Sequence, residues 1–138
     1  MPQICLAFDF GLRRIGVALG NTASGQARPL ATVHNPRSGQ IDWAGISAVV
    51  RDWAPDRLVV GLPGDADGDD GPLSARARRF SRQLQGRYAL PVSLVPEHLS
   101  TVEAARQGPP GAAGLDSLAA AVILQSWLDS HSTETPEP

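Results

Sequence analysis

Three carboxylates stand where their sequence neighbours are apolar. Asp9 ends the apolar run "ICLAFD", Glu97 follows the run "SLVP", and Asp116 opens a stretch with helical periodicity. A charge among buried side chains is costly unless a partner compensates it. If the three acids converge, each like-charged pair at about 4 Å costs about 4 kcal/mol at an effective dielectric near 20, and a cation removes that cost.

The chemistry of the donors indicates which cation is expected. Cys5 is the only cysteine, and no pair of histidines accompanies the acids, which disfavours zinc. Carboxylate oxygens suit Mg²⁺ or Mn²⁺. Two such ions can activate water and stabilise the leaving oxygen in phosphodiester hydrolysis. We therefore expect Asp9, Glu97 and Asp116 to be the catalytic residues and the ligands of two ions.

Each acid also has a simpler interpretation. Asp116 could stabilise a helix N-terminus through the helix dipole. Glu97 could be an exposed loop acid. Asp9 could be a buried structural carboxylate that is satisfied locally.

Composition limits the class of protein. The chain has 138 residues, of which 42% are hydrophobic, as expected of one globular domain. No run of apolar residues is long enough to span a membrane, and the N-terminus has no basic signal region. A lone cysteine excludes a disulfide framework, so we expect a cytoplasmic protein. The net charge of −2 gives no bulk attraction to nucleic acid, and all twelve basic residues are arginine.

Period-two and continuous apolar runs predict five strands, at residues 3–10, 14–20, 28–34, 57–62 and 90–95. The first is apolar on both faces except at Asp9, which is typical of a central strand. The short "GLR" segment after it indicates a tight hairpin. Pro29 indicates that the third strand lies toward an edge of the sheet.

Helical periodicity predicts helices at 40–54, 72–87 and 115–130, with a shorter one beginning at Ser100. Trp43, Trp53 and Trp127 fall on apolar helical stripes and are expected in the core. The stripe of the last helix begins at Asp116 and continues through apolar positions, so this acid should face the sheet.

The order of elements predicts an α/β fold. Three strands joined by short turns precede strands that alternate with helices, which implies a mixed five-stranded sheet with helices on both faces and the first three strands antiparallel. We expect a single domain over residues 1–130 and a flexible tail over 131–138.

Four segments resemble the YqgF family, also called RuvX, in the ribonuclease H-like superfamily. They are "FDFGLRRIGVAL", "VVGLPGDADGDDGP", "VPEHLSTVEA" and "LDSLAAAVILQSWLD". Their order and spacing match the family pattern over about residues 4–130. The resemblance implies a ribonuclease H-like fold and an acidic cluster of Asp9, Glu97 and Asp116. It also implies 5′-end maturation of precursor 16S rRNA in ribosome biogenesis, or cleavage of four-way DNA junctions.

The chain departs from the family pattern near Glu97. Pro96 and His98 stand where the family has Asp and Arg, and the segment 108–114, "GPPGAAG", is shorter and uncharged. Fewer phosphate contacts predict a weaker electrostatic grip on nucleic acid. This motivates an alternative hypothesis, a non-catalytic assembly factor that binds rRNA or a ribosomal component. Either a monomer or a homodimer is compatible with the sequence, and junction resolution would need a dimer.

Nucleic-acid contacts are assigned to a second group of residues. Gly11 would let backbone approach the scissile phosphate, Arg14 would clamp it, and His98 stands where the family has Arg. Arginines of the 72–87 helix could extend this surface, although a merely solvated helix face is the simpler interpretation. The predicted contact residues are Gly11, Arg13, Arg14, Arg78, Arg82 and His98.

Overall fold

The computed structural model describes residues 2–62, 72–96 and 115–131. Its strands are β1 (Ile4–Asp9), β2 (Arg14–Asn21), β3 (Gln26–His34), β4 (Arg57–Leu62) and β5 (Val92–Pro96). Its helices are α1 (Trp43–Trp53), α2 (Pro72–Tyr88) and α4 (Leu115–His131). The short helix predicted from Ser100 lies outside the described residues.

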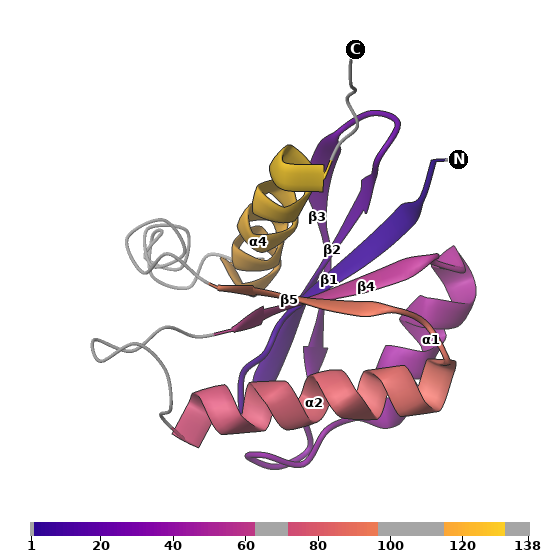
Figure 1. Ribbon diagram of the computed structural model, residues 1–138. Coiled ribbons are helices and arrows are strands. Elements are labelled where there is room, and N and C mark those ends of the chain that lie inside the picture. The colour runs from indigo at the N-terminus through magenta and orange to yellow at the C-terminus, as the bar shows by residue number, and fades with distance from the viewer. Residues whose placement is uncertain (1, 63–71, 97–114, 132–138) are drawn as a thin grey trace.

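The strands form one mixed sheet in the order β3-β2-β1-β4-β5 (Figure 1). β2 pairs antiparallel with both β1 and β3. β4 pairs parallel with β1 and with β5. The predicted mixed five-stranded sheet, with its first three strands antiparallel and the first strand central, is confirmed.

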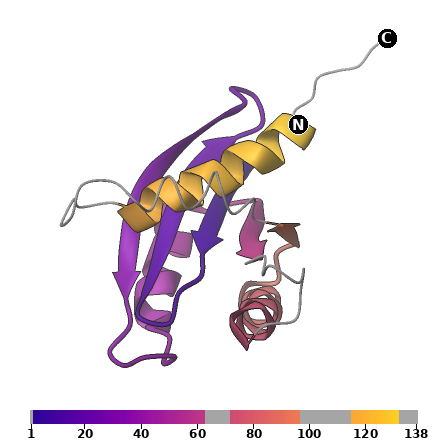
Figure 2. The same ribbon diagram turned by 90° about the vertical axis from the view of Figure 1, so that its left-hand side faces the viewer.

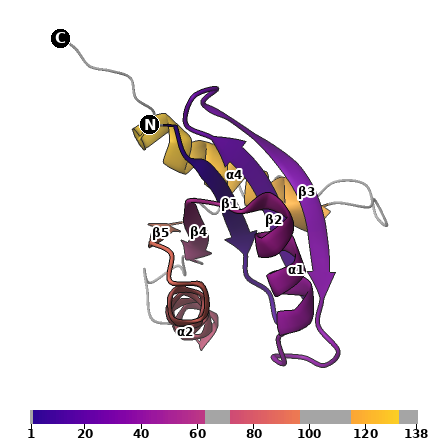
Figure 3. The same cartoon turned by 90° about the vertical axis from the view of Figure 1, so that its right-hand side faces the viewer.

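Alternating residues of β1 face two separate cores. Cys5 and Ala7 pack with buried residues of α4, whereas Leu6 and Phe8 pack with buried residues of α1 and α2. Accordingly, α4 covers one face of the sheet, and α1 and α2 cover the other (Figures 2 and 3). The alternation places Asp9 on the α4 side of the sheet and its neighbour Phe10 on the α2 side.

Several element boundaries differ from the predicted ones for local reasons. β3 begins at Gln26, and Pro29 is accommodated in this edge strand beside an irregularity in the pairing with β2. α1 begins at Trp43 because the Asp42 side chain accepts a hydrogen bond from the backbone of Gly45 and caps the helix. β5 begins at Val92, after Pro91.

Two expectations about the helices were wrong. Trp53 is 37% exposed, and the Arg28 guanidinium lies over its ring, so this tryptophan is not in the core. Trp127 is buried, as expected. His131 does not belong to the tail: it is the last residue of α4, and its ring stacks on Trp127 with centroids 4.4 Å apart. In the described ranges, no helix is both long and apolar enough to cross a membrane.

Burial of Cys5 on β1 yields a prediction about pH. Burial raises the pKa of its thiol to about 11, although nearby Arg57 acts in the opposite direction. The unfolded thiol ionises at lower pH, so the folded state should lose stability as pH rises from about 9 toward 11, by about 1 kcal/mol or more. Urea unfolding at about pH 8 and about pH 10 measures this loss.

The variant Cys5→Ala is the control for that experiment. It removes the thiol and should show a smaller loss of unfolding free energy between the two pH values. An equal loss in both proteins would contradict the assignment to Cys5.

Candidate active site

Asp9 is a buried acid at the C-terminal end of the central strand. It is 3% exposed and follows four buried residues of β1. Its antiparallel partner on β2 is Gly16, and paired residues of this kind have Cα atoms about 5 Å apart. Any residue that packs against Gly16 on the α4 side therefore also lies near Asp9.

The first turn of α4 touches β2 at Gly16. A Cβ atom added to Gly16 would overlap the backbone carbonyl of Asp116 and would lie 2.9 Å from the backbone nitrogen of Ser117. Only a glycine permits this direct contact between strand and helix backbones. Asp9 and Asp116 thus flank the same glycine, and the structure brings these two predicted residues together.

A row of small residues on β2 sets the height of α4 above the sheet. Gly16, Ala18 and Gly20 alternate along the strand on the α4 side, and a Cβ at Gly20 would lie 2.8 Å from Leu124. The alternation G-x-A-x-G is visible in "IGVALG", and it was the signal from which this contact could have been predicted. The prediction made for Gly11 concerns a different approach, that of the backbone to a phosphate.

Arg14 projects from the start of β2 toward Asp116. Its Nε lies 3.0 Å from Asp116 Oδ2, and the two side chains are 59% and 27% exposed. An ion pair with this exposure adds little stability. It does place one guanidinium beside Asp116. The predicted contact of Arg14 with nucleic acid stays a prediction.

The remaining predicted acid cannot be placed. Glu97 and His98 lie outside the described residues, and Pro96 is the last residue of β5. Among the residues that the structure describes, no three His, Cys, Asp or Glu side chains form a metal-binding group. Asp9 and Asp116, which both adjoin Gly16, are hard carboxylates that fit Mg²⁺ or Mn²⁺.

Gly11 and Arg13 lie in the hairpin between β1 and β2. A Cβ at Gly11 would lie 2.5 Å from the carbonyl oxygen of Arg14, so the tight hairpin itself requires a glycine. Arg13 is exposed, and its carbonyl accepts a hydrogen bond from the backbone of Asn35. Their contact with nucleic acid remains a prediction.

Arg78 and Arg82 lie on α2, which covers the sheet face opposite to α4 (Figure 3). The sheet therefore stands between these arginines and the acids, and the two groups do not share one face. Arg78 is half-buried and Arg82 is exposed. Their predicted nucleic-acid contact stays a prediction, on a surface separate from the acids.

Solved structures share this architecture. Thermus thermophilus RuvC superposes with a TM-score of 0.56 at 14% identity, covering 94% of this chain and 97% of that one. A second structure, of T. thermophilus RuvC in complex with a Holliday junction substrate, gives a TM-score of 0.57 at 15% identity and covers 93% and 94%. These likenesses establish the ribonuclease H-like fold.

Sequence comparison then establishes the family. The model of RuvX, described as Holliday junction resolvase, matches residues 3–130. The chain belongs to the RuvX family. Relatives named "Putative pre-16S rRNA nuclease" include one from Pseudomonas putida, 42% identical over 94% of this chain and 97% of its own length. Another, from Nitrosococcus oceani, is 44% identical over 96% and 90%.

The contact at Gly16 gives a prediction of stability. Gly16→Ala should lower the free energy of unfolding by about 1–3 kcal/mol, because the added methyl group forces the first turn of α4 away from the sheet. Urea unfolding monitored by circular dichroism measures the change.

Gly86→Ala is the matched control. Gly86 lies within α2, and a Cβ there meets nothing within 4 Å. This variant should be neutral or more stable by up to about 1 kcal/mol, since alanine favours helix. Equal effects of the two substitutions would contradict the close approach of α4.

Proposed function

We propose that this chain is a divalent-metal-dependent nuclease that matures the 5′ end of precursor 16S rRNA. The observation that carries the proposal is the juxtaposition of Asp9 and Asp116 across Gly16, at the end of the central strand. Family membership supports a nuclease, and the names of the relatives support the precursor 16S rRNA as substrate.

Asp9, Asp116 and Glu97 would hold Mg²⁺ or Mn²⁺. The bound ions would supply an activated water and stabilise the leaving oxygen of the phosphodiester. Asp9 is fixed in orientation because it ends a buried strand, and Asp116 is fixed because its own backbone lies against Gly16. Rigid placement of this kind suits a reaction that depends on in-line geometry.

Arg14 would bind the scissile phosphate. Its side chain is more than half exposed, so a phosphate can reach it from solvent while its Nε remains beside Asp116. A guanidinium can contact two acceptors at once, because it carries five N–H donors in a planar fork. Arg14 would thus align a phosphate with the carboxylates.

Branched DNA is the second candidate substrate. The description of the matching family model, Holliday junction resolvase, favours it. The same carboxylates would act on either backbone, so the two candidates differ only in the nucleic acid that is bound.

The first functional prediction concerns Asp9. With Mg²⁺, the wild-type protein should cleave a precursor 16S rRNA fragment, and Asp9→Asn should lower the rate about 100-fold or more, because a neutral amide binds the cation weakly. Asp52→Asn removes one exposed acid of α1 and should retain activity. Gel analysis of end-labelled RNA measures both variants, with a four-way DNA junction tested in parallel.

The outcomes separate the candidate functions. Cleavage of the junction but not of the RNA would show that the substrate is branched DNA and not precursor 16S rRNA. Binding of RNA without cleavage, together with no Mn²⁺ affinity that depends on Asp9 and Asp116, would overturn the nuclease and favour an assembly factor.

A second prediction distinguishes a phosphate-binding role of Arg14 from a structural one. Arg14→Ala should change the free energy of unfolding by less than about 1 kcal/mol, since exposed ion pairs contribute little. RNA cleavage should nevertheless fall about 10-fold or more through loss of a charge-assisted contact. Urea unfolding and cleavage kinetics measure the two effects. Unchanged cleavage, or a loss of stability that accounts for the lower rate, would refute the phosphate contact.

A further inference from the structure

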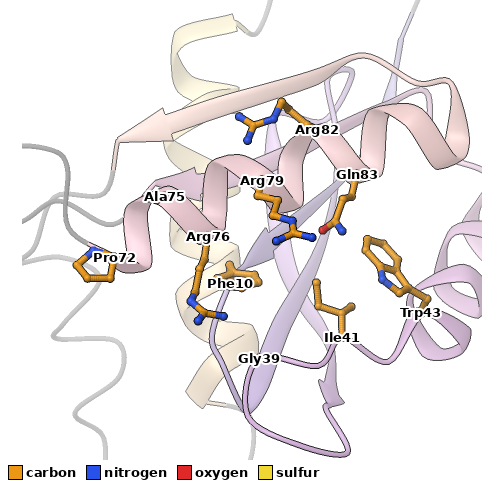
Figure 4. A pocket seen from close by; sticks show the side chains of 10 residues that line it. All are labelled: Phe10, Gly39, Ile41, Trp43, Pro72, Ala75, Arg76, Arg79, Arg82 and Gln83. Carbon is orange, nitrogen blue, oxygen red and sulfur yellow. The ribbon is translucent and has the colours of Figure 1, made fainter.

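A pocket of about 510 Å³ lies between α2 and the segment that connects β3 to α1. Figure 4 shows the residues that line it, from both elements and from the end of the central strand. They are Phe10, Gly39, Ile41, Trp43, Pro72, Ala75, Arg76, Arg79, Arg82 and Gln83. The pocket opens on the α2 side of the sheet, opposite to the α4 side on which Asp9 and Asp116 meet.

One wall of the pocket is cationic. Arg76 and Arg79 are one helical turn apart, and both side chains extend toward the segment with Gly39, whereas Arg82 lies at the rim (Figure 4). Within the described ranges, none of the three arginines forms an ion pair. α2 contains five arginines and no acidic residue. The pocket therefore concentrates positive charge that an anion can neutralise.

The opposite wall is shaped to receive Arg76. Gly39 has φ +79°, and a Cβ added there would lie 3.0 Å from Arg76 Nη1. The backbone of Gly39 is fixed by a 2.8 Å hydrogen bond from its N–H to the carbonyl of Leu12. The guanidinium of Arg76 is thus packed against a defined loop.

The remainder of the lining is apolar, with one amide. Ile41 and Phe10 form part of it, and the Trp43 indole is sandwiched between Phe80, at 5.6 Å, and the Arg87 guanidinium, at 4.0 Å. These two contacts hold the indole in place beside the pocket. The Gln83 side chain points between Arg79 and Trp43 (Figure 4). An amide offers both a donor and an acceptor to the edge of a nucleobase.

We propose that this pocket binds a nucleoside phosphate, with the phosphate on Arg76 and Arg79 and the base against Ile41, Trp43 and Gln83. Guanidinium groups match phosphate oxygens in geometry and charge. The apolar wall favours a planar base over a sugar alone. The volume lies within the range of small-molecule sites. The ligand is either a free nucleotide or one unit of a single-stranded RNA, and binding is independent of the proposed nuclease function.

Chemical-shift titration of ¹⁵N-labelled protein without divalent metal tests this site. Adenosine 5′-monophosphate should shift the Gly39 amide and the Trp43 indole N–H. Adenosine, ribose 5-phosphate and inorganic phosphate should each bind at least 10-fold more weakly, because each lacks part of the ligand. A short oligoribonucleotide is titrated in the same way. If it binds more tightly than adenosine 5′-monophosphate at the same resonances, the natural ligand is RNA. If it binds more weakly, the natural ligand is a free nucleotide.

Matched arginine variants decide which residues bind the phosphate. Arg76→Ala and Arg79→Ala should each weaken adenosine 5′-monophosphate binding about 10-fold, the loss expected for one charge-assisted hydrogen bond. Arg51→Ala, an equal change of charge at an exposed position of α1, should change it less than about 2-fold. Equal weakening by all three variants, no shift at Gly39 and Trp43, or equal affinity for ribose 5-phosphate would overturn the proposal. Because no metal or cleavage is involved, this result does not depend on whether the nuclease assignment holds.

Discussion

The direct backbone contact between β2 and the first turn of α4 determines the arrangement of the site. Gly16 has no side chain to hold the helix away, and Ala18 and Gly20 continue the same low surface along the strand. α4 therefore lies close to the sheet, and its apolar stripe packs against Cys5 and Ala7 of β1. Since Gly16 is also the pairing partner of Asp9, the contact that seats the helix simultaneously brings Asp116 to the end of the central strand.

This packing brings two acidic residues, Asp9 and Asp116, to the same end of the sheet. Two features of the structure reduce the electrostatic cost. The N-terminus of α4 carries the positive end of the helix dipole, which favours a carboxylate in its first turn. Arg14 supplies a guanidinium to Asp116 from the adjacent strand. The first feature is part of the fold and stays in place, whereas the second is a half-exposed side chain that can rearrange. A cation or a phosphate can therefore enter the site without any change in the packing of α4 on β2.

The sequence was sufficient to predict the five strands, the central position of β1 and the burial of the stripe that begins at Asp116. Each of these follows from periodicity and from apolar neighbours on the chain itself. The sequence was not sufficient to exclude Trp53 from the core, because its spacing matches the apolar stripe of the helix although its side chain, at the last residue of α1, is 37% exposed. It was also not sufficient to identify the close approach of α4 at Gly16, which no prediction from the sequence named. A glycine that a hairpin requires and a glycine that a helix contact requires look alike in sequence, and only the tertiary partner distinguishes them.

The two faces of the sheet differ in charge in a way that the net charge of −2 conceals. α4 carries Asp116 and no arginine, whereas the five arginines of α2 lie across the sheet from it (Figure 2). β1 and the residue after it connect the two layers, because Asp9 ends the strand on the α4 side and Phe10 packs in the core on the α2 side. Among the residues that the structure describes, the guanidinium paired with Asp116 is that of Arg14, whereas the arginines of α2 lie on the other face. This separation fits the proposed pocket, in which Arg76 and Arg79 of α2 would bind a phosphate on the face of the sheet opposite to the acids.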